Sequence, residues 1–292
     1  MNYQIIHTTR YRYNQTVSLC HNIARILIRD TDNQHCHHSE VSFTPQPDII
    51  NEYEDFFGNK VIYFAIQHEH RELSVTVRSM VEKNTVATKV GNLFDNLPWE
   101  EARKIILQPG YKHTDARQFI PVTKATTPTP EIVTYALQSF TVGRPIIEAA
   151  HDLMTRIFTD FTFDNTFSTI ATPLQEVMDA KKGVCQDFAH LAIACLRSVG
   201  LPARYVSGYL ETVPPPDKQK LVGMDASHAW FEIYVPEHRW LPFDPTNNMI
   251  PAQQHITIGW GRDFTDVSPL KGVVFSSGKH DMKVSVDVRR VG

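Results

Sequence analysis

The sequence predicts an α+β protein in which an N-terminal antiparallel β-sandwich is followed by a core of helices packed on an antiparallel sheet. Residues 1–83 hold alternating runs that are rich in β-branched and aromatic residues, which is typical of strands. From about residue 145, apolar residues recur at three- and four-residue spacing, and after Gly200 the strand pattern returns. We therefore expect a sandwich domain over 1–83, a crossing segment over 84–145, and a second domain over 146–292.

Composition limits the classes of partner. A chain of 292 residues with 42% hydrophobic and 21% charged residues is typical of a globular protein with two domains. The net charge of −3 gives no reason to expect nucleic acid or an anionic membrane as partner. No apolar run approaches the roughly 18 residues of a membrane span, and the start lacks an apolar signal core. We expect a cytoplasmic protein; the oligomeric state stays open.

The N-terminal part contains three clear strand candidates, at residues 3–17, 61–68 and 73–82. The segment DFFGN, residues 55–59, is the expected turn before the second of them. The segment QHCHH, residues 34–38, lacks the ligand spacing of a closed metal site, so we expect a solvated polar loop. The segment RYRY, residues 10–13, alternates on a strand and indicates a solvated face.

Helices are expected in the middle of the chain. One follows Pro98, and another carries Pro130 and Glu131 in its first turn. A third covers about 144–158, and the segment TPLQEVMDA, residues 172–180, starts a fourth. In that fourth helix we expect Thr172 as cap, Pro173 at the first position and Gln175 completing a capping box.

A fifth helix is expected to begin at about Cys185 and to end at Gly200, with Pro202 just beyond. Strands follow in ARYVSGYLET, HAWFEIYVP, RWLPFDP and the terminal KVSVDVRRV, and residues 214–225 are an expected exposed loop.

The four cysteines differ in their surroundings. In a chain this long, Cys20, Cys36, Cys185 and Cys195 form neither a disulfide scaffold nor a C-x-x-C zinc pair. At a helix N-terminus, unpaired N–H groups and the helix dipole favour the thiolate of Cys185. The same N–H groups, that of Gln186 among them, can bind a developing oxyanion. Cys195 lies nearly three turns later and is expected to be buried and inert.

A thiolate nucleophile needs a base and a group that orients the base. His228 stands at the start of a strand in DASHAWFEIYV, and Asp244 stands at the end of the next in WLPFDPT. If these strands form a hairpin with its turn at about 236–239, the two side chains lie near each other, with strand tilt or a bulge absorbing the unequal lengths.

Four blocks, GVCQDFAHL, LPARYVSGY, DASHAWFEIY and WLPFDPT, resemble the transglutaminase-like superfamily in order and spacing. The segments DFFGNKVIYFAI and GRDFTDVSPLKGV resemble the bacterial members that are often described as cysteine proteases and carry an N-terminal β domain. The resemblance implies a papain-like core with Cys185, His228 and Asp244 as a catalytic triad.

The resemblance also implies a reaction. Acyl transfer from an amide or peptide carbonyl through a thioester on Cys185 needs no metal and no organic cofactor, and hydrolysis is the first expectation, with a protein or peptide as substrate. Cross-linking of protein glutamine by a transglutaminase reaction and a non-catalytic binding role on the same fold stay open. No tryptophan lies between Trp99 and Trp230, so the role of the oxyanion-binding tryptophan of animal transglutaminases is unassigned here, and no segment resembles a calcium loop.

Several residues near the triad have two interpretations. Tyr209 and Trp230 are either walls of an acyl pocket or core residues. Asp187 favours the helix dipole, and His190 is expected to be packed or hydrogen-bonded beneath the site. For Arg262 and Asp263 a surface ion pair is the preferred interpretation.

Overall fold

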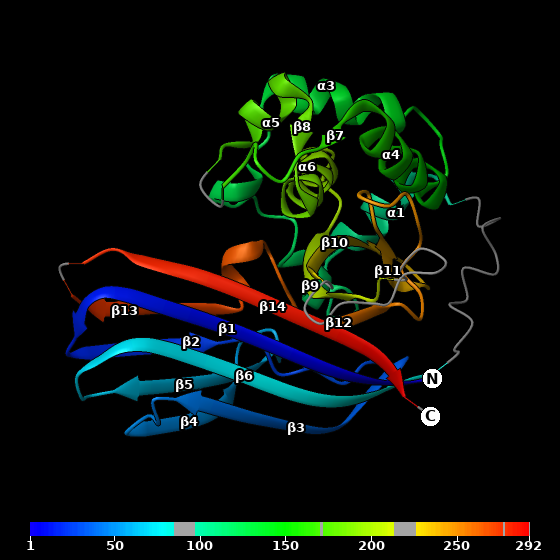
Figure 1. Ribbon diagram of the computed structural model, residues 1–292. Coiled ribbons are helices and arrows are strands. Elements are labelled where there is room, and N and C mark those ends of the chain that lie inside the picture. The colour runs from blue at the N-terminus through cyan, green and yellow to red at the C-terminus, as the bar shows by residue number, and fades with distance from the viewer. Residues whose placement is uncertain (85–96, 170–171, 213–225, 277, 292) are drawn as a thin grey trace, which may run out of the picture.

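The computed structural model describes residues 1–84, 97–169, 172–212, 226–276 and 278–291. Two bodies are stacked on each other (Figure 1). A two-sheet β-sandwich forms the lower body, and a four-stranded sheet covered by helices forms the upper one. The predicted α+β class, with an N-terminal sandwich followed by helices and an antiparallel sheet, is confirmed.

The sandwich consists of two four-stranded antiparallel sheets, in the orders β14-β1-β6-β3 and β13-β2-β5-β4. Alternate residues of these strands point inward and form an apolar core that includes Phe64, Val75 and Ile66. The N-terminal strands are β1 (Asn2–Val17), β2 (Leu19–Ala24), β3 (Gln34–Thr44), β4 (Ile49–Glu54), β5 (Lys60–Ile66) and β6 (His70–Lys83).

The last two strands of the chain also belong to the sandwich. Strand β13 (Leu270–Phe275) pairs with β2, and β14 (His280–Val291) pairs with β1 from Asn2–Val291 to Tyr13–His280. The division by sequence placed this tail in the 146–292 domain. An alternating pattern predicts a strand but does not predict which strand it pairs with. In the structure, β1 pairs with β6 along one edge and with β14 along the other.

Three local features of the N-terminal part were predicted from the sequence, and the structure confirms two of them and corrects the other. Residues 55–59 form the turn between β4 and β5, with Gly58 at φ +70°, as predicted. Residues 34–38 are not a loop; they open β3, because their backbone pairs with β6 and the Gln34 side chain is buried. Arg10 and Arg12 are exposed on β1, whereas Tyr13 is buried.

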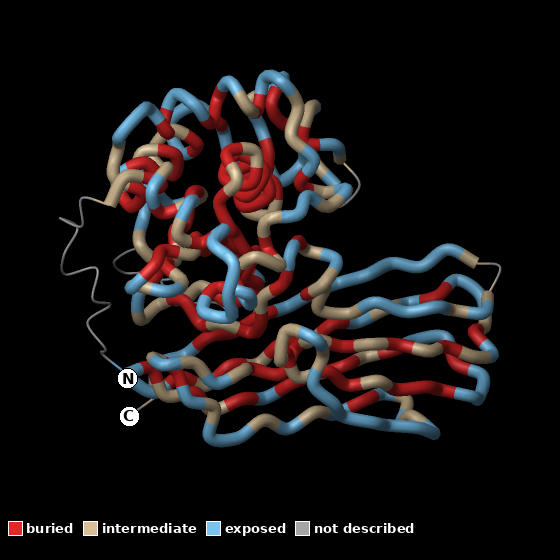
Figure 2. Tube along the Cα trace, turned by 180° about the vertical axis from the view of Figure 1, so that it is seen from behind, coloured by how far each residue is buried: buried red, intermediate tan, exposed pale blue. Residues whose placement is uncertain are grey.

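The helices lie on one side of the second sheet and pack around α6, which is buried at every residue from Asp187 to Arg197 (Figure 2). Segment 97–145, expected as a crossing, contributes Trp99, Ile132 and Phe140 to this core. The helical elements are α1 (Trp99–Leu107), α2 (Thr114–Arg117), η2 (Lys124–Thr126), α3 (Pro130–Ser139), α4 (Ile146–Asp160), α5 (Leu174–Ala180) and α6 (Cys185–Ser198).

Helix boundaries agree with the sequence signals except at α5. Pro173 is the N-cap of α5, and its ψ of 146° keeps it outside the helix, so the helix begins at Leu174. Thr172 Oγ1 accepts a hydrogen bond from Thr169 N at 2.9 Å in the preceding turn, and Gln175 donates to Asp179 at 2.7 Å, so the expected capping box does not form. Gly200, at φ +80°, ends α6 as predicted.

The second sheet has the order β11-β10-β9-β12 and separates the helices from the sandwich. The expected exposed loop at 214–225 lies outside the described residues, between β9 and β10. The strands are β9 (Ala203–Leu210), β10 (Ala226–Val235), β11 (Arg239–Phe243) and β12 (His255–Gly261); a parallel pair, β7 (Thr162–Phe163) and β8 (Lys182–Gly183), and a 3-10 turn, η3 (Phe264–Asp266), complete the structure.

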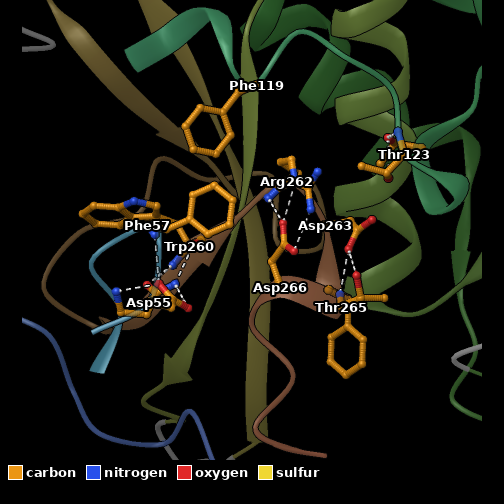
Figure 3. A network of polar contacts seen from close by, with 12 residues as sticks. Asp55, Phe57, Phe119, Thr123, Trp260, Arg262, Asp263, Thr265 and Asp266 are labelled. Carbon is orange, nitrogen blue, oxygen red and sulfur yellow. Dashed lines mark hydrogen bonds and ion pairs between the residues drawn. The ribbon is translucent and has the colours of Figure 1, made fainter. Parts of the chain in front are cut away.

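Side-chain amides of the sandwich complete the outer edge of β12. Gln34 Nε2 donates to Thr257 O at 2.8 Å, and Gln34 Oε1 accepts from Thr257 N at 2.9 Å. Asn59 makes the same pair of bonds to Trp260, at 2.8 and 3.0 Å, beside its turn partner Asp55 (Figure 3). An edge strand otherwise leaves such groups unpaired, so these amides join the two bodies through backbone groups.

Among the described residues, no helix is both long and apolar enough to cross a membrane.

Candidate active site

Cys185 is the first residue of α6, and hydrogen bonds of the residues around it fix its position. Strand β8, directly before it, pairs with β7, and Asp164 N donates to Gly183 O at 2.9 Å. Asp187 Oδ2 accepts from Val184 N at 2.9 Å and from the Ser168 hydroxyl. The thiol is therefore held at the end of a helix whose first-turn N–H groups have no intrahelical acceptors.

Cys185 and Cys195 differ in how far they are buried. Cys185 is partly exposed, whereas Cys195 is completely buried in the helical core. Burial raises the pKa of the Cys195 thiol to about 12, with a smaller opposing effect of Arg156 and Lys181. Cys195 thus has neither access to solvent nor a charge environment that favours a thiolate.

His228 and Asp244 meet through the hairpin of β10 and β11. The register pairs Phe231 with Phe243, so its continuation brings Asp244 opposite Trp230, diagonally next to His228. His228 Nε2 lies 2.8 Å from Asp244 Oδ2. The turn falls at residues 236–238, as predicted, and Asp244 leaves the strand through a bridge to Met249.

Cys185 also lies near His228, close enough to raise the pKa of its ring. Since Nε2 faces Asp244, Nδ1 is the ring atom left for the thiol. Burial alone would lower the pKa of His228, but the hydrogen bond with Asp244, the nearby Cys185 and the charge of Asp244 raise it to about 10. His228 therefore carries a proton at neutral pH and supplies a cation next to Cys185.

Asp244 is fully buried and accepts hydrogen bonds at both oxygens. Oδ1 accepts from Thr246 N at 2.9 Å and Asn247 N at 3.3 Å, and Oδ2 accepts from Asn247 Nδ2 at 2.7 Å and His255 Nε2 at 3.0 Å, besides His228. Burial would raise the pKa of Asp244, but these donors hold it well below its usual range. Asp244 is therefore an oriented carboxylate.

The set of His228, Asp244 and His255 also brings three metal-binding atoms within 4.8 Å of one another. Both histidine nitrogens, however, point at the same carboxylate oxygen at 2.8 and 3.0 Å. These are hydrogen-bond distances between the ligand atoms themselves, and a zinc ion would need about 2.0–2.2 Å from each of them to a common centre. The arrangement is that of two donors on one acceptor.

The other predicted pocket residues lie away from Cys185 or behind His228. Tyr209 is buried, and its hydroxyl lies 2.8 Å from Nδ1 of His7 in β1, so it belongs to the contact between the two bodies. Trp230 is buried, with its ring 6.1 Å from that of His228 and 5.2 Å from that of His255. These contacts support the interpretation of both residues as core residues.

His190, on α6, and Asp263, just before η3, lie where these two elements meet. His190 Nε2 accepts a hydrogen bond from Phe264 N at 3.1 Å, and burial lowers its pKa to about 4 despite the nearby Asp263. Asp263 is buried and accepts from Thr265 N at 2.7 Å, whereas Arg262 pairs with Asp266 at 2.9 Å (Figure 3). The expected ion pair therefore forms with a different carboxylate.

His255 and Asn247 were not anticipated from the sequence. His255 opens β12, which lies beside β9 and not beside the preceding strand β11. It pairs with Leu210, two residues from the Gly208 that faces His228. Asn247 lies three residues after Asp244 in the same turn. The turn sequence D-P-T-N, residues 244–247, is the feature from which a contact between the two side chains could have been predicted.

Family models match both bodies. Residues 3–82 match the bacterial transglutaminase-like N-terminal region, and residues 136–245 match the transglutaminase-like superfamily. An uncharacterized protein of Mycobacterium tuberculosis is 39% identical over 295 residues, covering 98% of this chain and 92% of that protein.

Two further comparisons cover the fold and the core. The crystal structure of a candidate cysteine protease from Cytophaga hutchinsonii superposes with a TM-score of 0.75 over 100% of this chain and 92% of that one, at 21% identity, and so shows the fold alone. A protein-glutamine gamma-glutamyltransferase of Pseudomonas aeruginosa is 37% identical over 78 residues, which are 26% of this chain and 12% of that enzyme.

Proposed function

The chain belongs to the transglutaminase-like superfamily, and from this premise we propose that it is a cysteine enzyme that hydrolyses an amide or peptide bond through a thioester on Cys185. The observation that carries the proposal is the line of side chains from the Cys185 thiol through the His228 ring to Asp244. A thiol near a histidine that contacts a buried carboxylate supports the roles of nucleophile, base and orienting group for these three residues.

In the first half of the reaction, the Cys185 thiolate attacks the carbonyl carbon and the carbonyl oxygen becomes an oxyanion. The first-turn N–H groups of α6, those of Cys185 and Gln186, are the donors that the helix offers to this charge. His228 then transfers its proton to the leaving nitrogen, the C–N bond breaks, and the acyl group stays on Sγ as a thioester.

In the second half, neutral His228 takes a proton from water, and the resulting hydroxide attacks the thioester. The C–S bond breaks, the carboxylic acid leaves, and the thiolate and imidazolium are restored. Asp244 holds the ring orientation throughout and favours the protonated form.

Transfer to an amine instead of water is the second candidate. It is favoured by the similarity of the core to the Pseudomonas gamma-glutamyltransferase. The same thioester would serve both reactions, and the acceptor decides between a new acid and a new amide.

The deciding experiment measures iodoacetamide labelling of each cysteine against pH by mass spectrometry, in the wild type and in His228→Ala. We expect Cys185 to react about tenfold or more faster than the partly exposed Cys36 at about pH 6, and to lose this advantage in the variant. A Cys185 that reacts like Cys36 and is indifferent to His228 would contradict the proposal and favour a binding role. Peptide and amide libraries, with and without an added amine, then separate hydrolysis from transfer.

A further inference from the structure

Two histidines of β3 lie side by side on the surface of the sandwich. Strand β3 is an edge strand of its sheet (Figure 1), and its pairing with β6 shifts in register between Cys36 and His38, which is the mark of a bulge. The rings of His35 and His37 are 4.8 Å apart from centre to centre. Their side chains are 57% and 50% exposed, so an ion in solution can reach both rings.

A carboxylate holds each of the two rings. Nδ1 of His35 lies 3.1 Å from Oδ1 of Asp30, and Nε2 of His37 lies 3.0 Å from Oε2 of Glu82. In a neutral imidazole, the nitrogen that donates to a carboxylate carries the proton, and the other nitrogen holds a lone pair. Nε2 of His35 and Nδ1 of His37 are therefore the atoms that can bind a metal ion. A carboxylate on the other nitrogen is the usual arrangement for histidines that ligate metals, because it orients the ring and raises its basicity.

The separation of the rings suits one shared ion. A zinc ion lies about 2.0–2.1 Å from each histidine nitrogen, which puts the centres of two imidazoles on one ion roughly 4.5–5 Å apart. The distance between the rings of His35 and His37 is in this range, and both side chains are exposed enough to turn toward a common centre.

The pair differs in this respect from the buried histidines at the triad. There, His228 and His255 bond to the same oxygen of Asp244, and the ring nitrogens are spent on that acceptor. On β3, two separate carboxylates each take one nitrogen of one ring, and the second nitrogen of each ring is left for an ion.

The charges around the pair favour a cation. Asp30 and Glu82 contribute two negative charges, whereas Lys60, with Nζ 3.9 Å from Oδ2 of Asp30, contributes one positive charge. Asp30 is also held in place by the backbone, because Cys36 N donates to its Oδ1 at 2.7 Å. A bound divalent ion would thus meet a net negative surrounding that is partly fixed before binding.

We propose that His35 and His37 form an open binding site for a late transition-metal ion of the kind that imidazole ligates, Zn²⁺, Ni²⁺ or Cu²⁺. The ion binds Nε2 of His35 and Nδ1 of His37, and water fills its remaining positions. Asp30 and Glu82 orient the rings from their other side. The segment 34–38 lacks the spacing of a closed site, and the carboxylates come instead from the loop before β3 and from β6.

Calorimetry tests the proposal with zinc chloride and nickel chloride, each titrated alone into the full-length protein at pH 7.5. Magnesium chloride is the control, because Mg²⁺ prefers oxygen ligands. Two imidazoles are half the ligands of a structural zinc site, so we expect a dissociation constant of about 1–100 µM for zinc or nickel. No saturable binding of either ion below about 1 mM, or equally tight binding of magnesium, would overturn the proposal.

Variants at exposed or half-exposed positions locate the ion. His35→Asn and His37→Asn should each weaken binding about tenfold or more, because one imidazole cannot chelate alone. Glu82→Gln should weaken binding severalfold, since it removes the charge that orients His37. His151→Gln, which changes an exposed histidine of α4, should leave the affinity unchanged.

The outcome does not depend on the proposed reaction, because the site lies on the sandwich and binding is measured without a substrate. Metal binding that is equally tight in the wild type, His35→Asn and His37→Asn would place the ion elsewhere, for instance at the Cys185 thiol, and would overturn the proposal.

Discussion

Nε2 of His255 lies 3.0 Å from Oδ2 of Asp244, the same oxygen that His228 contacts at 2.8 Å. The carboxylate is thus shared between the ring of His228, which lies next to Cys185, and the ring of His255, which packs against Trp230. Burial lowers the pKa of His255, more than the hydrogen bond to Asp244 raises it. His255 is therefore a neutral donor, and its role at the site is to position Asp244.

Replacing this donor should destabilise the protein. His255→Leu removes a hydrogen bond to a buried carboxylate, and we expect the free energy of unfolding to fall by about 1.5–3 kcal/mol. His255→Gln keeps an N–H donor and should recover part of the loss. Urea denaturation of both variants measures the difference, and equal stability of the two would argue against the hydrogen bond as the cause.

The stability of the fold should depend on His228 in the alkaline range. Its pKa is raised from 6.5 to about 10 because the hydrogen bond with Asp244 and the nearby Cys185 outweigh burial. The folded state therefore binds the proton more tightly than the unfolded chain does, and this stabilisation is complete below about pH 6.5 and lost as the pH rises through about 10.

We expect the free energy of unfolding to fall between about pH 6.5 and pH 10, and to fall less steeply in His228→Gln than in the wild type. Denaturant titrations at a series of pH values measure both slopes. His151→Gln changes an exposed histidine and should behave like the wild type. The same slope in all three proteins would show that His228 binds its proton no more tightly in the folded state.

The bonds from Asn59 to Trp260 should be a measurable part of the contact between the two bodies. Asn59→Ala leaves the backbone N–H and carbonyl of Trp260 without these partners, and we expect a loss of about 1–3 kcal/mol. Asn51→Ala, at an exposed position of β4, should change stability by no more than about 0.5 kcal/mol. A loss in Asn59→Ala as small as in Asn51→Ala would show that water replaces the amide.

Gly208 is directly opposite His228 on β9, and no side chain fits there. A Cβ at this position would lie 2.3 Å from Ile256 O and 2.4 Å from the Trp230 ring. We expect Gly208→Ala to cost about 1–3 kcal/mol and to slow iodoacetamide labelling of Cys185, because the displaced Trp230 ring contacts His228. If Gly208→Ala keeps the stability and the labelling rate of the wild type, strands β10 and β12 move apart around the added methyl group without strain.

The parts of the site that were predictable are those with local signals. Gly183, Cys185 and Gly200 mark the limits of α6, and the hairpin between His228 and Asp244 follows from two adjacent strands and a short turn. The acyl-pocket interpretation of Tyr209 did not hold, because the side chain meets His7, which is contributed by the first strand of the chain. Hydrophobic periodicity predicts local secondary structure, so it gives no information on a contact between residues that lie so far apart in the sequence.

The sequence also did not predict which strands pair with each other. The alternating pattern of residues 283–291 predicts a strand. It does not predict whether that strand pairs with β1 or with β11, because the sequence does not show which strands lie at the edge of a sheet. His255 was missed for the same reason: two strands, β10 and β11, separate its own strand β12 from the neighbouring β9 in the chain. Sheet order is a property of packing, and it determines which side chains surround Asp244.

The pairing of β1 with β14 has a consequence for biosynthesis. During translation, the segment that carries Cys185, His228 and Asp244 leaves the ribosome before residues 280–291 exist, so it can pack its helices while β1 still lacks a neighbour on one side. The sandwich closes only when the last strand arrives. Until then the backbone groups along that edge of β1 have no partner strand, which is the kind of edge that pairs with other chains.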